Sequence, residues 1–384
     1  MTNWAQRRRR LYNVVFFFSL RVILLTAQVM LLAPIIRSKQ RGAYRTHAAL
    51  TCFALLVLLL LCGVTPFLLR IIASTYERVS VQFDAIFLLI AMTSQVSDIS
   101  IVLITMLSQL CQRWRLCEFL NQLQDTVQRV RAIHGRNFIN AQVLLLLWLQ
   151  LGLSLYDMLM QLVFLAKLAF QIAPWQIVVN LMSLYLQQCR ATLQLLIMGC
   201  VLLLIACYAQ LAECLEHYSE DSGADLTNYE DLVSLQNVLY KLTLQLKCVF
   251  QLPLFLLVAG EFINVLANLY AQLYYFVTTK AWWFAFVFYC AKISVELYLL
   301  IHVVHLCCVL HGKVNNLFLD RDVYFEEPTT ACCCLELTHS DALWPKPIRF
   351  YILGMFELNN EFWLFLVSYS VNFIVIIVQF GFFT

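Results

Sequence analysis

Long apolar runs recur along this chain of 384 residues, and several exceed the roughly 20 residues that a helix needs to cross a bilayer. Hydrophobic residues make up 62% of the chain and charged residues 13%, against roughly half and a quarter in a soluble domain. A soluble core cannot bury that excess, and the strands of a membrane barrel would alternate apolar and polar residues instead. The sequence therefore predicts an all-α, polytopic membrane protein.

Seven runs have the length and composition of transmembrane helices. They cover residues 46–72, 83–110, 141–171, 175–207, 250–275, 282–310 and 361–383. We find no internal repeat and no low-complexity linker, so we expect one domain over residues 1–384. It begins with an N-terminal segment, residues 1–45, and spans one to six follow over residues 46–310. A connection, residues 311–359, leads to the last span, residues 360–384. Within the connection, the apolar residues 348–356 are too few to span and predict a short amphipathic helix.

The N-terminal segment carries a further apolar run, residues 11–36, between two basic clusters. If this run crossed the membrane, equally basic flanks would lie on opposite sides, against the positive-inside tendency. We therefore expect the run to lie along or dip into the inner leaflet. An eighth span is the alternative.

Lys and Arg residues decide how the seven spans are oriented. They gather in the N-terminal segment, in the connection after the second span and in the connection after the sixth. By the positive-inside rule the N-terminus is cytoplasmic and the C-terminus extracellular. That orientation is opposite to that of a G-protein-coupled receptor.

The last run carries its few polar residues in one line. Glu361, Ser368, Asn372 and Gln379 are separated by steps of seven, four and seven, so they share one face of a helix. Such a polar stripe in a membrane faces either another helix or water. One interpretation is a pore lined by several copies of the helix, with Glu361 favouring cations at its inner mouth; ordinary helix packing is the other.

Other polar and aromatic side chains within the spans indicate a small-molecule pocket in the outer half of the membrane, because each is costly in lipid. They are Asp84, Asp157, Gln161, Gln176, Asn180, Asn264, Asn268, Tyr270, Gln272, Trp282, Trp283, Tyr289, Lys292 and Glu296. Lys292 and Glu296 are one helical turn apart and able to pair. The alternative is that the amides serve helix packing and that the tryptophans mark the membrane border.

The sequence shows no clear pattern of metal-binding or catalytic residues. The triple cysteine at 332–334, near His339, lacks the spacing of a structural zinc site. His302 and His305 have no neighbouring carboxylate in sequence, which favours hydrogen bonds between helices. No metalloprotease, nucleophile-elbow or phosphate-loop pattern is present. We therefore expect that the protein is not an enzyme and that it has neither a cofactor nor a metal site.

The end of the chain resembles the insect gustatory receptors. Near the C-terminus this family has Thr-Tyr, five hydrophobic residues and Gln-Phe; here Asn372 and Phe373 are followed by residues 374–378 and then Gln379 and Phe380. Gln379 and Phe380 match, whereas Asn372 and Phe373 depart from the motif. The seven-span layout, the cytoplasmic N-terminus and the basic second connection extend the resemblance across the chain.

The resemblance implies a homomeric or heteromeric tetramer that forms a ligand-gated, non-selective cation channel. The last helices would surround the pore, and Gln379 and Phe380 would form its gate. The implied partners are a small-molecule tastant, monovalent and divalent cations, the lipid bilayer and other receptor subunits. The implied location is the plasma membrane of a gustatory neuron dendrite. Sugar-sensing members tend to have an acid where this chain has Ile374, which favours a bitter-type tastant.

Two other classes of membrane protein remain as alternatives. A G-protein-coupled receptor would have the opposite orientation and an Asn-Pro-x-x-Tyr near the end of its last span, and the sequence has neither. A secondary transporter usually shows repeats and helices broken by Gly or Pro at matching places in two halves. The sequence shows no such symmetry.

Overall fold

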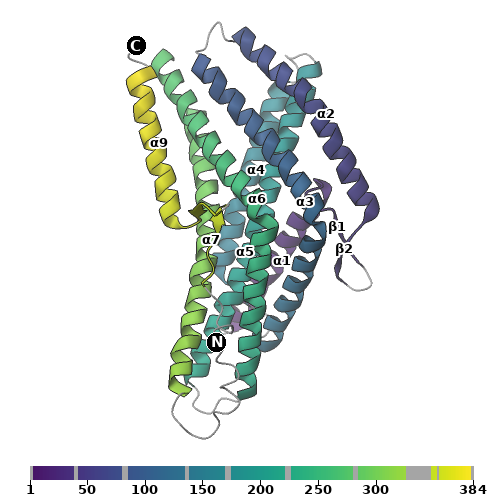
Figure 1. Cartoon of the computed structure of the whole chain (residues 1–384), viewed down its shortest axis with the longest axis vertical. Helices are drawn as coiled ribbons and strands as arrows, with labels where there is room; N and C mark the ends of the chain where they lie inside the picture. The colour runs from purple at the N-terminus through teal and green to yellow at the C-terminus, as the bar shows by residue number, and fades with distance from the viewer. Residues whose placement is uncertain are drawn as a thin grey trace.

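A bundle of long helices dominates the computed structural model of the chain (Figure 1). The helices are α1 Asn3–Val29, α2 Ala48–Val79, α3 Ala85–His134, α4 Ala141–Leu168, α5 Pro174–Glu220, α6 Leu226–Thr279, α7 Phe284–Phe325 and α9 Asn360–Gly381. Two short hairpins join β1 Ile35–Arg37 to β2 Tyr44–Thr46 and β3 Tyr351–Ile352 to β4 Phe356–Glu357. The structure describes residues 3–38, 42–79, 85–134, 138–168, 174–220, 226–279, 284–325, 347–352 and 354–381.

The helices confirm the predicted all-α class. Each of the seven predicted spans falls on one helix, α2 to α7 and α9. By length and composition, 7 helices of the described residues could cross a membrane. That set includes α1 through its stretch Arg10–Val29 and leaves out α9, whose apolar stretch Asn360–Ile376 is shorter.

Four helices continue well past the ends of their predicted spans. The 54 residues of α6 would extend about 80 Å at 1.5 Å per residue, against about 30 Å for the hydrocarbon core. Likewise, α3 continues to His134 and α5 to Glu220. In Figure 1 the ends of α5, α6 and α7 extend together below the rest of the bundle. Nearly all residues from Thr192 to Tyr208 of α5 are buried, so this helix is the centre of the core.

Local signals account for several helix starts. The Asn140 side chain accepts a hydrogen bond from the Val143 amide at 2.9 Å, and Asn359 accepts one from Phe362 at 2.8 Å. Both are N-cap contacts, which satisfy amide groups that the first turn leaves free. Pro174 is the first residue of α5, where its missing N–H costs nothing.

The N-terminal helix α1 packs against α5 and α4. The Asn13 side chain accepts a hydrogen bond from the Ile139 amide at 3.3 Å, and the Arg131 guanidinium lies 4.1 Å from the centre of the Phe17 ring. Just beyond α1, the first hairpin is held on α3 by two hydrogen bonds between the Asn121 amide and the backbone of Tyr44. These contacts fix α1 beside the lower half of the bundle (Figure 1).

The segment before α9 is a hairpin, so the short helix predicted over residues 348–356 is wrong. Strands β3 and β4 pair antiparallel, with Tyr351 opposite Glu357. Gly354 lies in the turn with a φ of 77°, a conformation that ends any helix and that glycine adopts without strain. The hairpin lies at the base of α9, where it contacts α6 (Figure 1).

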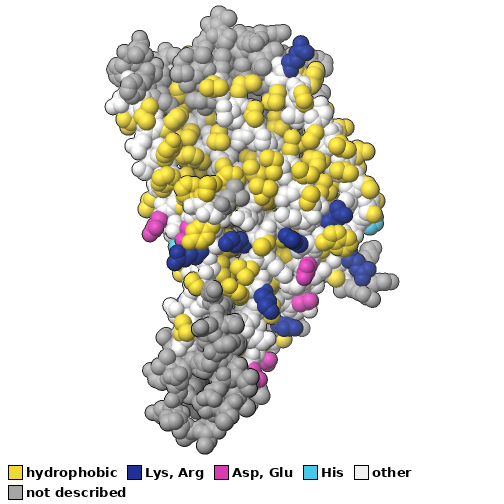
Figure 2. Space-filling model, in the orientation of Figure 1, with side chains coloured by type: hydrophobic (Ala, Val, Ile, Leu, Met, Phe, Trp, Pro, Cys, Tyr) yellow, Lys and Arg dark blue, Asp and Glu magenta, His cyan; other side chains and the backbone are white. Residues whose placement is uncertain are grey.

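Side chains of different kinds separate along the length of the molecule. Figure 2 shows hydrophobic side chains spread over the upper half of the visible face, and Lys and Arg gathered just below them. The exposed apolar residues include Phe53 and Leu59 on α2, Trp148 on α4 and Leu364 on α9. A broad exposed apolar surface of this kind fits a lipid environment.

Candidate functional site

A buried ion-pair centre joins three helices. Arg190 of α5 contacts Asp98 of α3 at 2.5 Å through Nη1, and Glu261 of α6 at 3.1 Å through Nε. The Asn264 side chain, one turn from Glu261, donates a hydrogen bond to Asp98 Oδ1 at 3.3 Å and accepts one from Ser94. We call these residues the Arg190 centre.

A second centre lies on α7 and α4. The Lys292 ammonium pairs with Glu296 at 2.9 Å and with Asp157 at 3.4 Å, and it lies 5.7 Å from the centre of the Tyr289 ring. Gln161 donates a hydrogen bond to Asp157 at 3.2 Å and another to Gln187 of α5. We call these residues the Lys292 centre.

Helix α5 connects the two centres. Gln194, one turn from Arg190, donates a hydrogen bond to the backbone oxygen of Glu296 at 3.1 Å. All six charged side chains of the two centres are buried. Burying charges is tolerated only when they are paired and hydrogen-bonded. Together the Arg190 and Lys292 centres form one charge cluster that takes residues from α3, α4, α5, α6 and α7.

Several residues predicted for a ligand pocket meet in this cluster. They are Asp157, Gln161, Asn264, Tyr289, Lys292 and Glu296, including the expected Lys292–Glu296 pair. Asn268 borders the cluster through a hydrogen bond of 2.7 Å to the backbone oxygen of Asn264, whereas Tyr270 stacks on Tyr274. Asp84, Trp282 and Trp283 lie outside the described residues, and the described side chains do not include those of Gln176 and Asn180.

The sequence prediction missed the three charged residues of the Arg190 centre and included only its Asn264. Asp98, Arg190 and Glu261 are each an isolated charge among uncharged residues, and their partners lie on other helices. The signal available was the high cost of a lone charge within a span. That cost identifies each residue as paired, but it does not name the partner.

The last helix presents its polar stripe away from its own bundle. Glu361, Ser368, Asn372 and Gln379 are all exposed, whereas Leu366 on the opposite face is buried. That opposite face packs on α6 and α7, where Tyr369 meets Phe262 and Trp363 meets Tyr298. The Phe380 side chain lies outside the described part of α9. His302, which stacks on Tyr298 and lies 3.5 Å from the Asn360 side chain, adds to the contact between α7 and α9.

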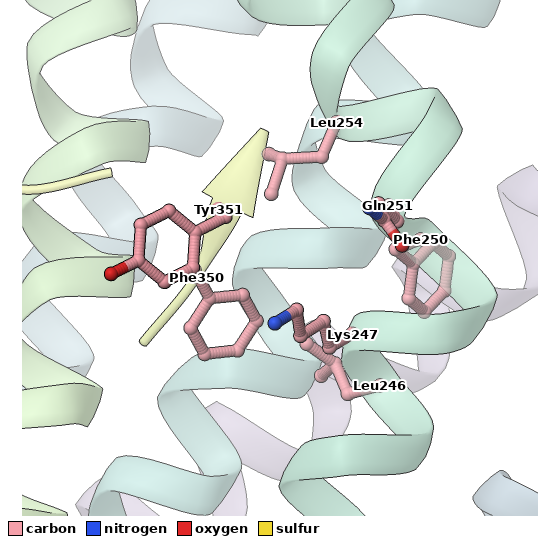
Figure 3. Close-up of a pocket in the computed structure, with 7 residues that line it drawn as sticks. All are labelled: Leu246, Lys247, Phe250, Gln251, Leu254, Phe350 and Tyr351. Atoms are coloured by element: carbon pink, nitrogen blue, oxygen red, sulfur yellow. The ribbon is translucent and has the colours of Figure 1, made fainter. Parts of the chain in front are cut away.

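A small pocket lies where the second hairpin meets α6. Figure 3 shows Phe350 and Tyr351 on one side and Leu246, Phe250 and Leu254 of α6 on the other. The Lys247 ammonium donates a hydrogen bond to the backbone oxygen of Arg349 at 3.1 Å. Beside it, the Leu358 amide donates to the Phe350 oxygen at 2.7 Å. The contacts around this pocket therefore connect α6 to the segment that leads into α9.

The model of the family described as 7tm chemosensory receptor matches residues 20–333, most of the chain. The chain belongs to the insect 7tm chemosensory receptor family. This receptor is 32% identical over 357 residues to "Putative gustatory receptor 89a" of Drosophila melanogaster. The aligned residues make up 92% of this chain and 93% of the Drosophila protein. The resemblance to gustatory receptors is thereby confirmed.

Two solved structures share the receptor's fold. The insect olfactory receptor OR5 from Machilis hrabei in complex with eugenol matches with a TM-score of 0.66, and another structure of the same protein matches with a TM-score of 0.64. Each covers 96% of this chain and 99% of the olfactory receptor, at 12% sequence identity. Because it belongs to a chemosensory receptor family, the receptor is a multi-pass membrane protein and not an enzyme.

Proposed function

We propose that the receptor is a subunit of a ligand-gated, non-selective cation channel in the plasma membrane of a gustatory neuron, opened by a small-molecule tastant. The exposed polar stripe of α9 carries this proposal. In a single subunit surrounded by lipid, Glu361, Asn372 and Gln379 would face hydrocarbon at high cost. Assembly around a shared axis removes that cost, because the same stripe then lines water.

The orientation follows from the distribution of charge. Lys and Arg gather just below the hydrophobic band, on its side toward the end of the molecule that carries the N-terminus (Figures 1 and 2). By the positive-inside rule that end is cytoplasmic and the C-terminus is extracellular. In this orientation α1 stays at the inner leaflet, Glu361 lies at the inner mouth of the pore, and Gln379 and Phe380 lie near its outer end. There, the Gln379 amides and the Phe380 side chains of all subunits would encircle the pore. They would form a gate that excludes water when it is closed.

The ligand would bind among the outer halves of α3 to α7, at the charge cluster and above it. A small molecule binds where aromatic groups and a few hydrogen-bonding groups converge, and Tyr289, Asn268 and Gln161 supply both kinds. The olfactory receptor of the same fold was solved in complex with eugenol, a small molecule. Ile374, which stands where sugar-sensing members tend to have an acid, favours a bitter-type tastant over a sugar.

Electrical recording tests this function. Cells that express the full chain, with or without partner subunits, should pass cation current when a tastant is applied. Phe380→Ala should alter closing, because it removes the ring proposed to exclude water. Ligand-evoked signals that persist without membrane current, and that disappear when G proteins are blocked, would rule out a channel.

A further inference from the structure

The charge cluster holds more negative than positive groups. Four carboxylates, those of Asp98, Asp157, Glu261 and Glu296, surround two cations, Arg190 and Lys292. If all six groups are ionised, a surplus of two negative charges is buried among apolar helices. Such a surplus is costly in a medium of low dielectric constant.

Among the four carboxylates, Glu261 has an oxygen that is able to accept a further hydrogen bond. Its side chain is 1% exposed, and Oε1 pairs with Arg190. Its other oxygen, Oε2, has no hydrogen-bond partner within the part of the chain that the structure describes. An ionised carboxylate accepts hydrogen bonds at both oxygens, so a buried one with a bare oxygen needs a donor.

The position of Glu261 lets a single ligand act on both centres. Arg190 and Asp98 of one centre, and Lys292 and Glu296 of the other, all lie within electrostatic range of Glu261. The carboxylates are separated by the two cations, and among the described residues no three His, Cys, Asp or Glu side chains converge as a metal ion requires. A group that donates hydrogen bonds and carries positive charge fits this arrangement better than a bare metal ion.

A polar stripe on α6 leads to this carboxylate. Glu261, Asn264, Asn268 and Gln272 are separated by steps of three, four and four, so they share one face of the helix toward its C-terminal end. Asn264 and Gln272 are buried and Asn268 is half-buried. A ligand that approaches from that end of α6 would meet hydrogen-bonding groups along its way to Glu261.

We propose that the charge cluster selects ligands with a cationic group, an ammonium or a guanidinium, which donates to Glu261 Oε2 and offsets the surplus negative charge. The proposal rests on the ligand site proposed above and adds its chemical class. A neutral ligand of the same shape leaves the surplus in place. The receptor should therefore discriminate between an amine and an alcohol that are otherwise alike.

Matched probes on the purified full-length receptor test the assignment. We would measure the thermal stability of the receptor with benzylamine and benzyl alcohol, and with 2-phenylethylamine and 2-phenylethanol. The amines should stabilise the wild type more than the alcohols do. Glu261→Gln keeps the shape but removes the charge, and it should weaken amine binding about ten- to hundredfold, the range for a lost charge-assisted hydrogen bond.

Glu118→Gln is the matched control, because it makes the same change at an exposed site on α3, about 30 Å along the helix from Asp98. It should leave the preference for amines unchanged. Equal stabilisation by the alcohols, no stabilisation by either amine, or equal amine binding by wild type and Glu261→Gln would overturn the assignment. If Glu261→Gln does not fold, the comparison of amine with alcohol on the wild type still decides.

Current recorded from the same receptor separates this inference from the channel proposal. A neutral tastant that opens a current without help from any amine would leave the channel intact and refute the cationic class. Amine binding that depends on Glu261 but never produces current would support the class and refute the channel.

Discussion

Arg190 is the residue on which the buried charges of three helices depend. Its guanidinium serves Asp98 and Glu261 at once, and its side chain is 5% exposed. A guanidinium presents several donors in a fixed plane, which suits two carboxylates on different helices better than an ammonium would. The two ion pairs of Arg190 therefore position α3 and α6 relative to α5, and they also balance charge.

Replacing Arg190 should be much more harmful than replacing an exposed partner. Arg190→Leu leaves two buried carboxylates unpaired, and we expect a loss of about 3–5 kcal/mol in the free energy of unfolding. Lys313→Leu removes one member of an exposed pair with Glu216, so it should cost no more than about 1 kcal/mol. Thermal unfolding of the purified variants measures both, and equal losses would contradict the role of Arg190.

The residues also show how far the sequence alone leads toward the site. Lys292 and Glu296 were predicted as a pair because their contact is local, one turn along the same helix. The partners of Asp98, Arg190 and Glu261 depend on how α3, α5 and α6 pack, and a helical pattern carries no information about that packing. The Lys292–Glu296 pair was therefore predictable in advance, and the contacts between helices were not.

At the scale of elements, the second hairpin connects α6 to the start of α9, in addition to the direct packing of α9 on α6 and α7. Phe350 is 2% exposed against α6, and the Phe350 oxygen accepts from Leu358, just before α9 begins. Lys247 of α6 holds the same segment by donating a hydrogen bond to the backbone oxygen of Arg349. We therefore expect a movement of α6 to shift the start of the proposed pore helix.

Loosening this link should change gating while leaving the rest of the bundle intact. Phe350→Ala removes a buried ring, a change that costs about 3–5 kcal/mol in a packed core, and here the loss falls on the contact between the hairpin and α6. We expect more current without ligand and a smaller response to ligand. Met355→Ala, at an exposed position in the turn of the same hairpin, is the control. Unchanged gating in Phe350→Ala at normal surface expression would count against the link.

The helices were predictable and the hairpin was not, for a physical reason. Each span needs about 20 apolar residues, and that requirement is visible in composition alone. Residues 348–356 are apolar but short, and short apolar runs fit a helix or a strand equally well. The positive φ of Gly354 decides in favour of a turn. Similarly, the continuation of α5, α6 and α7 beyond the bilayer comes from packing among themselves, which hydropathy does not report.

At the scale of the whole molecule, one subunit leaves its most polar membrane face uncovered. The stripe of Glu361, Ser368, Asn372 and Gln379 points away from α6 and α7, so no part of the described chain covers it. Closed cyclic symmetry brings the same stripe from every copy to one axis. The proposed tetramer therefore completes a surface that the single chain cannot complete.

A mixture of subunits tests the shared pore. Gln379→Lys would place a ring of ammonium groups in the pore and repel cations. If one such subunit blocks a tetramer, equal expression with wild type should reduce ligand-evoked current to about one sixteenth, because only channels with four wild-type copies conduct. Glu118→Lys adds charge at an exposed site on α3 and should leave the current of the mixture unchanged. A fall only to half would mean that each subunit conducts alone, and the stripe would then need a different explanation.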